Sequence, residues 1–219
     1  MNLFLDTANL SDIKTWQPTG LIDGITTNPS LLSKETTNPT AHLREICSIM
    51  HPHDVSIEVT EQEPKAVYEQ AKKIAGLAKN VIVKIPCHVD YLSVIKQLVN
   101  ENIKINITLV FSLVQGLLMC KLGVYYISPF IGRLDDIDSD GIALIEQLRH
   151  MIDFYGFETK ILAASIRHIQ HLHDSVQAGA DIATVPSGII KTAMAHPLTT
   201  QGMTQFNADW QKLGIRQFP

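Results

Sequence analysis

Short apolar runs of about five residues recur along the chain, each followed by a segment with apolar residues at helical spacing. The helical spacing is clear in residues 65–78, 91–100 and 142–154, where apolar side chains recur every three or four positions. A strand followed by a helix, repeated eight times, is typical of a parallel sheet with helical crossovers. The predicted strands are residues 2–6, 24–26, 55–59, 81–85, 104–108, 125–129, 160–164 and 181–185.

Eight strand–helix units predict an α/β fold, the closed (β/α)8 TIM barrel, for which 219 residues is an ordinary length. A doubly wound open sheet is the alternative, but it usually carries a glycine-rich turn after its first strand, and residues 6–9 are Asp-Thr-Ala-Asn. No linker divides the chain, so we expect residues 1–219 to form a single barrel domain. We expect an additional C-terminal helix at about residues 199–213, packed on the barrel's outside or on a neighbouring subunit.

The composition is that of a globular protein, with 45% apolar residues, 18% charged residues and a formal net charge of −4. Because lysine and arginine are scattered, we expect neither nucleic acid nor an anionic membrane as a partner. No apolar stretch approaches the roughly 18 residues needed to cross a bilayer, and we expect no signal peptide. The cysteines Cys47, Cys87 and Cys120 lack metal-ligand spacing, which predicts free thiols and a cytoplasmic location.

One lysine, Lys84, lies inside a run that otherwise has the composition of a buried strand, residues 81–85. Burying an ammonium group is costly unless it is paired or loses its proton. A lysine without its proton is a nucleophile suited to forming a Schiff base with a carbonyl substrate. An exposed edge strand is the alternative explanation from this segment alone.

The other strands favour an inward position for Lys84. In residues 103–108 the isoleucines share one side of the strand and the polar residues share the other, and residues 55–59 repeat the pattern. Outer faces of barrel strands must be apolar because helices cover them, so the polar set is predicted to face the interior. It comprises Asp6, Glu58, Lys84, Asn106, Thr108 and Ser128.

Most of these polar residues lie late in their strands, toward the face where barrel enzymes carry out their chemistry. One lysine, two carboxylates and three neutral hydrogen-bonding groups predict an active site in which the lysine is the nucleophile and a carboxylate transfers protons. The alternative is the solvated face of an open antiparallel sheet, where the same alternation is routine. The helical segments between the strands favour parallel crossovers and therefore the barrel.

Eight short motifs, spread over nearly the whole chain, carry these polar residues and several loop arginines. In one-letter code they are L-D-T-A-N from position 5, G-I-T-T-N-P-S-L from 24, V-K-I-P from 83, N-I-T-L-V-F-S from 106, I-S-P-F-I-G-R from 127, A-A-S-I-R from 163, G-A-D-I-A-T from 179 and H-P-L-T from 196. In this order they resemble the transaldolase family, particularly its short microbial branch, and the related fructose-6-phosphate aldolases.

The resemblance implies a role for each inward residue that would take part in the chemistry. Lys84 would form the Schiff base with a ketose phosphate, and Asp6 would accept a hydroxyl proton as the carbon–carbon bond breaks. Glu58, with Thr108, would hold a water that transfers protons while the imine forms and hydrolyses. A protonated imine accepts the electrons released by bond cleavage, so neither a metal nor a cofactor is expected.

The resemblance also implies which residues hold the sugar phosphate substrate. The hydrogen-bonding groups for the three-carbon dihydroxyacetone unit would be Asn28, Asn106 and Ser128. The phosphate-binding residues at the far end of the sugar would be Arg133, Ser165 and Arg167. Guanidinium groups make bidentate, charge-assisted contacts with phosphate, whereas ordinary surface ion pairing is the alternative for loop arginines.

Two positions distinguish the two branches of the family. The aldolases carry glutamine where this chain has Glu58, and tyrosine where it has Phe130. Phenylalanine lacks the hydroxyl that helps protonate the intermediate off the enzyme, so the resemblance implies a transaldolase that hands its three-carbon unit to an aldehyde acceptor. The alternatives are a lyase acting on fructose 6-phosphate and, more remotely, a non-catalytic phosphosugar-binding barrel.

Two further expectations concern regions outside the predicted site. Short members of the family assemble as rings through a C-terminal helix, which implies a homo-oligomer such as a decamer, with Met203, Phe206 and Trp210 as contacts. His168, His171 and His173 do not share one helix face with an acidic ligand, so we expect solvent-facing histidines and no metal there.

Overall fold

The computed structural model describes residues 1–214, whose strands form one closed barrel. Every strand is parallel to its two neighbours, and the last strand pairs with the first through Asn2 opposite Ile182. The predicted eight-stranded barrel is therefore confirmed. The strands are β1 (Asn2–Asp6), β2 (Gly24–Thr26), β3 (Asp54–Glu58), β4 (Val81–Pro86), β5 (Ile105–Val110), β6 (Tyr126–Pro129), β7 (Lys160–Ala163) and β8 (Ile182–Val185).

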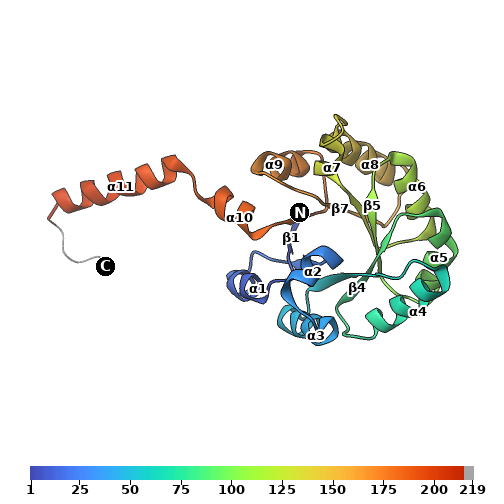
Figure 1. The fold of residues 1–219 in the computed structure, drawn as a ribbon. Coiled ribbons are helices and arrows are strands. Elements are labelled where there is room, and N and C mark those ends of the chain that lie inside the picture. Colours follow the sequence, from blue (N-terminus) through green and yellow to red (C-terminus); the bar gives the residue numbers. More distant parts are fainter. Residues whose placement is uncertain (215–219) are drawn as a thin grey trace.

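Helices connect successive strands and surround the barrel (Figure 1). Many begin at an asparagine, aspartate, serine or histidine whose side chain accepts a backbone N–H of the first turn, as Ser112 does before the helix that follows β5. The helices are α1 (Leu10–Trp16), α2 (Pro29–Glu35), α3 (Pro39–Met50), α4 (Pro64–Ala75), α5 (Leu92–Asn100), α6 (Leu113–Leu122), α7 (Ile131–Asp135), α8 (Gly141–Tyr155), α9 (Ile169–Gln177), α10 (Ser187–Met194) and α11 (Pro197–Lys212), with short 3-10 turns at Gln17–Thr19 and Val89–Tyr91.

Two apolar layers hold the barrel together. The larger layer lies between strands and helices, where Ile105 and Ile107 of β5 join Ile95 and Leu98 of α5 in one fully buried cluster. This outward placement of the isoleucines is what their alternation with polar residues predicts. The smaller layer fills part of the barrel's interior with the side chains of Phe4, Ile82, Tyr126, Leu162, Ala164 and Ile182.

The interior layer depends on a large ring placed opposite a glycine. Phe4 of β1 lies in register with Gly24 of β2 and meets Tyr126 edge-on, with 6.1 Å between ring centroids. The Tyr126 hydroxyl donates to Asp54 at 2.7 Å, which satisfies a polar atom in an apolar surrounding. A Cβ on Gly24 would lie 2.5 Å from Phe4 Cζ, so this glycine makes room for the ring.

Strand and helix boundaries differ from the predicted ones by a few residues at most. The predicted C-terminal helix is present as α11, but it extends away from the barrel after α10 (Figure 1). Met203 and Phe206 are exposed, and α11 has no buried residue. Of the two expected positions for this helix, the outside of its own barrel is therefore excluded, which leaves a neighbouring subunit as the other.

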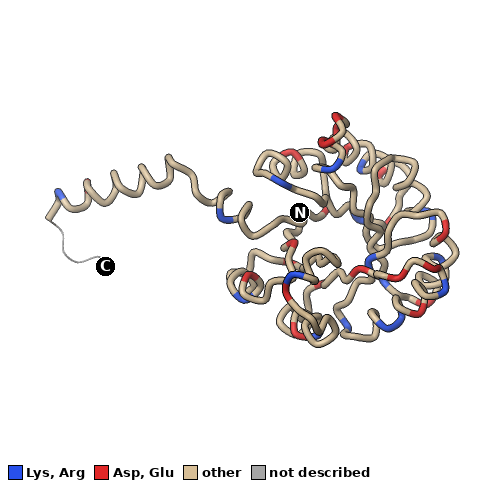
Figure 2. The backbone as a smooth tube through the Cα atoms, in the orientation of Figure 1, with Lys and Arg blue, Asp and Glu red and all other residues tan. Residues whose placement is uncertain are grey.

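Charges of both signs are interspersed around the barrel rather than gathered in one block (Figure 2). This mixture agrees with the small net charge of −4. Within residues 1–214, no helix combines the length and the apolar character that crossing a membrane requires.

We predict that Gly24→Ala destabilises the barrel. Because the added methyl group would meet a rigid aromatic ring rather than a flexible chain end, Phe4 must shift, and overpacking of this kind typically costs about 1–3 kcal/mol. Urea unfolding measures the loss in free energy of unfolding. Gly76→Ala is the matched control, since its methyl group makes only ordinary contacts, 3.5 Å from the Lys72 carbonyl oxygen. Equal stability of the two variants would contradict the packing argument.

Candidate active site

Three polar side chains lie in one row across β3, β4 and β5. Register places Glu58 beside Lys84 and Lys84 beside Asn106. Lys84 Nζ lies 3.0 Å from Glu58 Oε2 and donates to the Thr27 carbonyl oxygen at 3.2 Å. Lys84 is only 5% exposed, so these two acceptors offset the desolvation of its ammonium group. The structure places Lys84 in the interior, as its strand position predicts.

Asn106 is held from both sides by hydroxyl groups. Its Oδ1 accepts from the Ser128 hydroxyl at 2.8 Å, and its Nδ2 donates to Ser56 Oγ at 3.2 Å. All three residues are buried. These bonds fix the orientation of the amide next to Lys84, and they leave little freedom for it to rotate.

Asp6, at the end of β1, accepts a hydrogen bond from one member of a pair of threonines. The Thr26 hydroxyl donates to Asp6 Oδ1 at 2.8 Å and lies 2.6 Å from the Thr184 hydroxyl. Burial raises the pKa of the Asp6 carboxyl above its usual value, while the Thr26 hydrogen bond and the positive charge of Lys84 act in the opposite direction. The sequence-based prediction missed both threonines, although each is a polar residue close to the end of its strand.

Thr108 lies where β5 becomes irregular. Pairing of β5 with β6 shifts between Ile107 and Val110, and Leu109 has a φ of 60°. The Thr108 hydroxyl is buried and forms no hydrogen bond with any residue in the range 1–214. A buried hydroxyl without a partner is uncommon, and it leaves a donor and an acceptor available to a small polar molecule.

A cavity of about 180 Å³ opens at the carboxyl ends of the strands and gathers most of the predicted residues. Glu58, Asn106 and Thr108 do not line it. Glu58 and Asn28 line a second hollow, of about 730 Å³, that includes residues of α2, α3 and α4. The residues lining the first cavity are Asp6, Thr26, Asn28, Lys84, Ser128, Phe130, Arg133, Leu162, Ala164, Ser165 and Thr184.

Asn28 contributes to the cavity from the start of α2. Its Oδ1 accepts the Leu31 N–H at 2.9 Å and so caps the helix. Its Nδ2 makes no hydrogen bond within the described part of the chain, so it remains a donor at the cavity wall.

The two predicted phosphate-binding arginines lie differently. Arg133 lines the cavity, with its guanidinium carbon 5.1 Å from the centre of the Phe130 ring. Arg167 does not line the cavity, and both of its terminal nitrogens bind the carboxylate of Asp136. Ser165 lines the cavity in a left-handed backbone conformation, with a φ of 60°. The structure thus brings Arg133 and Ser165 together at the cavity and leaves Arg167 outside.

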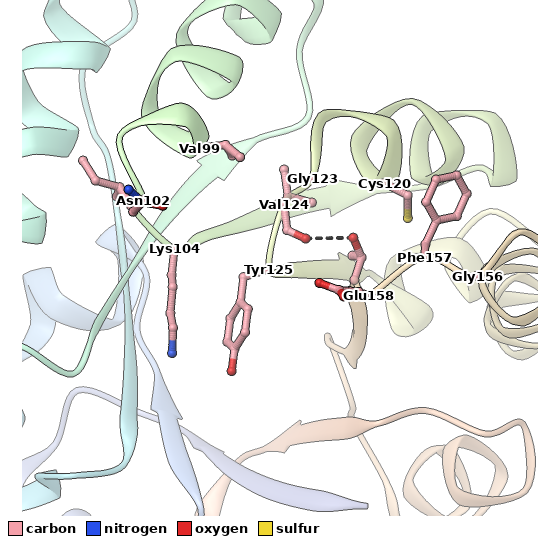
Figure 3. Close-up of a pocket in the computed structure, with 12 residues that line it drawn as sticks. Val99, Asn102, Lys104, Cys120, Gly123, Val124, Tyr125, Gly156, Phe157 and Glu158 are labelled. Carbon is pink, nitrogen blue, oxygen red and sulfur yellow. Dashed lines mark hydrogen bonds between the residues drawn. The ribbon is translucent and has the colours of Figure 1, made fainter.

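A third hollow, of about 540 Å³, lies at the opposite end of the barrel, among the segments that enter β5, β6 and β7 (Figure 3). Lys104 and Tyr125 lie side by side there, with the ammonium 4.3 Å from the ring centroid. The Thr159 hydroxyl donates to the Val124 carbonyl oxygen at 2.7 Å. None of the predicted site residues lines this hollow, although it exceeds the cavity at Lys84 in volume.

Cysteines and histidines do not add a reactive centre to the cavity. The three cysteines are free, and burial raises the pKa of the half-buried Cys87 thiol, which disfavours its thiolate. Within residues 1–214, no group of three histidine, cysteine, aspartate or glutamate side chains has the geometry of a metal site. The expectation that the histidines face solvent is wrong for His171, which is buried and bound to Asp135 at 2.7 Å.

Comparison with known proteins identifies one enzyme family that matches nearly the whole chain. The family model described as transaldolase/fructose-6-phosphate aldolase matches residues 3–217. A probable transaldolase of Parvibaculum lavamentivorans is 47% identical over 215 residues, which covers 98% of each chain. A probable transaldolase of Lactiplantibacillus plantarum is 47% identical over 217 residues, with 99% of this chain and 100% of the relative covered. The chain therefore belongs to the transaldolase/fructose-6-phosphate aldolase family.

Proposed function

We propose that the protein is a transaldolase, which transfers a dihydroxyacetone unit from sedoheptulose 7-phosphate to glyceraldehyde 3-phosphate and so yields erythrose 4-phosphate and fructose 6-phosphate. The observation that carries this proposal is the buried Lys84, which is paired with Glu58 and lines a cavity together with Asp6. Relatives of this chain carry the name probable transaldolase. A buried amine facing a cavity is suited to forming an imine with a ketose.

Formation of the imine requires Lys84 to lose a proton and the ketose to lose its carbonyl oxygen as water. Glu58 Oε2, at 3.0 Å, is placed to take the proton from Nζ. The neutral amine then attacks the ketose carbonyl, and water leaves to give the protonated imine. The unpartnered Thr108 hydroxyl is a binding group for the water that carries protons in this step and in the reverse hydrolysis.

Cleavage of the carbon–carbon bond places Asp6 in the role of base. Its carboxylate removes the proton from the hydroxyl on C4 of the ketose, which becomes the aldehyde carbon of the leaving aldose phosphate. The electrons of the breaking C3–C4 bond move into the protonated imine. An aldose phosphate leaves, and the three-carbon unit stays on Lys84 as an enamine. When the acceptor aldehyde adds to the enamine, Asp6 returns the proton to the new hydroxyl.

The binding residues divide between the two ends of the sugar. Asn28 Nδ2 and Ser128 line the cavity and hydrogen-bond the dihydroxyacetone unit near Lys84, while the buried Asn106, which does not line the cavity, orients the Ser128 hydroxyl. Arg133 and Ser165, at the cavity wall, bind the phosphate. Arg167 completes this phosphate site once its guanidinium leaves Asp136.

The family also contains aldolases, so release of the three-carbon unit to water is the second candidate reaction. Phe130 lines the cavity and carries no hydroxyl to protonate the enamine. Glu58 is also the carboxylate expected of transaldolases. Both residues favour transfer to an aldehyde over release.

We further propose that residues 1–219 act as a single barrel domain in the cytoplasm and that α11 joins copies of the chain into a ring. The exposed apolar side chains of Met203 and Phe206 on a helix without buried residues support this assembly.

We predict that borohydride, added with fructose 6-phosphate, leaves a reduced three-carbon adduct on Lys84, because reduction converts the imine into a stable amine. Peptide mass analysis locates the adduct. Lys84→Met removes both the adduct and the turnover, whereas Lys104→Met, at the opposite end of the barrel, keeps both. An unmodified Lys84 in the intact enzyme would exclude the transaldolase and the aldolase alike.

We predict that Phe130→Tyr raises the release of glyceraldehyde 3-phosphate from fructose 6-phosphate without acceptor by roughly 10²-fold, the lower end of what a positioned proton donor contributes. A coupled assay with and without erythrose 4-phosphate measures release and transfer. Phe111→Tyr is the matched control, since Phe111 meets the Phe130 ring edge-on at 5.9 Å but does not line the cavity. If the unaltered enzyme released aldehyde without acceptor as fast as it transfers, the lyase would be the better assignment.

We predict that Thr26→Val moves the acid limb of the kcat/KM profile for cleavage to higher pH. Asp6 must be a carboxylate to accept the proton, so activity falls as pH drops through its pKa. The Thr26 hydroxyl holds that pKa down, and its loss raises the pKa further. Thr26→Ser retains the hydroxyl and should keep the profile of the unaltered enzyme. A limb that stays in place in Thr26→Val would show that Asp6 is not the titrating base.

A further inference from the structure

Two adjacent carboxylates end α7, the short helix that carries Arg133, and their surroundings differ. Asp135 Oδ2 lies 2.7 Å from His171 Nε2, and Asp135 Oδ1 accepts the Gly141 N–H at 3.3 Å. Both carboxylate oxygens of Asp135 therefore join α7 to other helices, one to Gly141 at the start of α8 and one to His171 in α9. Asp135 holds the helix in place.

The buried His171 is suited to this structural contact in its neutral form. Its Nδ1 accepts the Arg167 N–H at 3.3 Å, so the proton of the neutral ring lies on Nε2, facing Asp135. Burial and the nearby His168 lower the pKa of His171, whereas Asp135 acts in the opposite direction. One tautomer satisfies both bonds, and this fixes the backbone of Arg167 relative to α7.

Asp136, the next residue, has no such structural function. Within residues 1–214 its carboxylate bonds only to Arg167, with Nη2 2.6 Å from Oδ2 and Nη1 facing Oδ1. The two side chains are 46% and 51% exposed. The hydrogen bond from Arg167 lowers the pKa of Asp136, and the charges of Arg167 and, to a smaller degree, Arg133 act in the same direction, so this carboxylate is charged.

Gly132, in the first turn of α7, allows Arg167 to lie across the helix toward Asp136. A Cβ on Gly132 would lie 2.8 Å from Arg167 Nε and 3.0 Å from its Cδ. The same Cβ would lie 2.4 Å from the Ser165 carbonyl oxygen. Both terminal nitrogens of the guanidinium are thereby bound to a carboxylate instead of facing the cavity.

We propose that Asp136 lowers the affinity of the site for phosphate by competing with the substrate phosphate for Arg167. This inference rests on the proposed function, in which Arg133 and Ser165 bind the phosphate first. Arg167 then exchanges a carboxylate for a phosphate, which offers the same bidentate geometry and more negative charge. Asp136 thereby weakens the binding of any phosphate at this site and favours release of the product.

Arg167 can exchange Asp136 for a phosphate at small energetic cost, because exposed ion pairs contribute little free energy. Pairs of this kind are typically worth about 0.2–1 kcal/mol, so a phosphate that also binds Arg133 displaces the carboxylate at small cost. Because the pair is bidentate, it belongs to the upper part of that range, and removing the carboxylate should strengthen phosphate binding about two- to fivefold in the dissociation constant.

The opposite function for Asp136 makes the opposite prediction. If the carboxylate orients Arg167 so that the remaining N–H groups bind the phosphate, then its removal weakens phosphate binding and raises KM. If the pair is only a surface ion pair, neutralising Asp136 changes neither quantity. The sign of the change therefore separates competition from orientation.

The test compares Asp136→Asn with the unaltered protein in binding inorganic phosphate by calorimetry and in KM for fructose 6-phosphate. We expect both constants to fall about two- to fivefold, with little change in kcat. The matched control is Asp138→Asn, which removes the same charge two residues away. Asp138 is exposed, its side chain forms no hydrogen bond or ion pair within residues 1–214, and its φ is 56°, which asparagine tolerates.

Borohydride trapping with dihydroxyacetone, which has no phosphate, separates this proposal from the proposed function. We expect Asp136→Asn to trap the adduct on Lys84 as the unaltered protein does. If both proteins trap the adduct but Asp136→Asn binds phosphate equally or more weakly, then Asp136 does not compete with phosphate. The transaldolase proposal would still stand in that case. Failure of trapping in both proteins overturns the proposed function. Absence of phosphate binding in both overturns the competition by removing its ligand.

Discussion

The ion pair between Lys84 and Glu58 is the interaction on which the arrangement of the site depends. Their side chains are only 6% and 15% exposed, so either charge alone would lie uncompensated in the barrel. Removing one partner of such a pair typically costs about 3–5 kcal/mol, because the other charge stays buried. The pair forms because β3 and β4 are parallel and in register at these two residues. The closed barrel therefore supplies the geometry that makes a buried amine tolerable.

Much of the fold and the inward-facing residues of the site follow from the sequence, because both depend on the alternation of apolar and polar residues along each strand. A strand buried against helices on its outside must place apolar residues at every second position, as Ile105 and Ile107 do, and the residues between them face the interior. Lys84, Asn106 and Ser128 were placed correctly by this argument alone. The resemblance to a family added chemical roles, and the geometry is compatible with most of them.

What the sequence could not predict depends on contacts between distant segments. Thr26 and Thr184 meet only because β8 closes onto β1, across 158 residues of chain. The burial of His171 depends on how the loop after α7 folds back, and the partner of Arg167 depends on the space above Gly132. The direction of α11 depends on the break around His196, where α10 has ended and a proline begins the next helix. The alternation of apolar and polar residues determines which face of a strand a side chain occupies. It does not determine how the loops and helices run between the strands.

Phe130 links the apolar layer of the barrel to the chemistry above it. Its ring packs against the interior cluster, meets Phe111 edge-on and carries the Arg133 guanidinium over one face, while part of it lines the cavity. A cation over an aromatic face is stabilised by the ring, so the same residue also positions Arg133, the proposed phosphate-binding group. A hydroxyl at this ring would place a proton donor beside the enamine. In the proposed reaction, the absence of this hydroxyl means that the ring supporting Arg133 also keeps the enamine from being protonated before an aldehyde arrives.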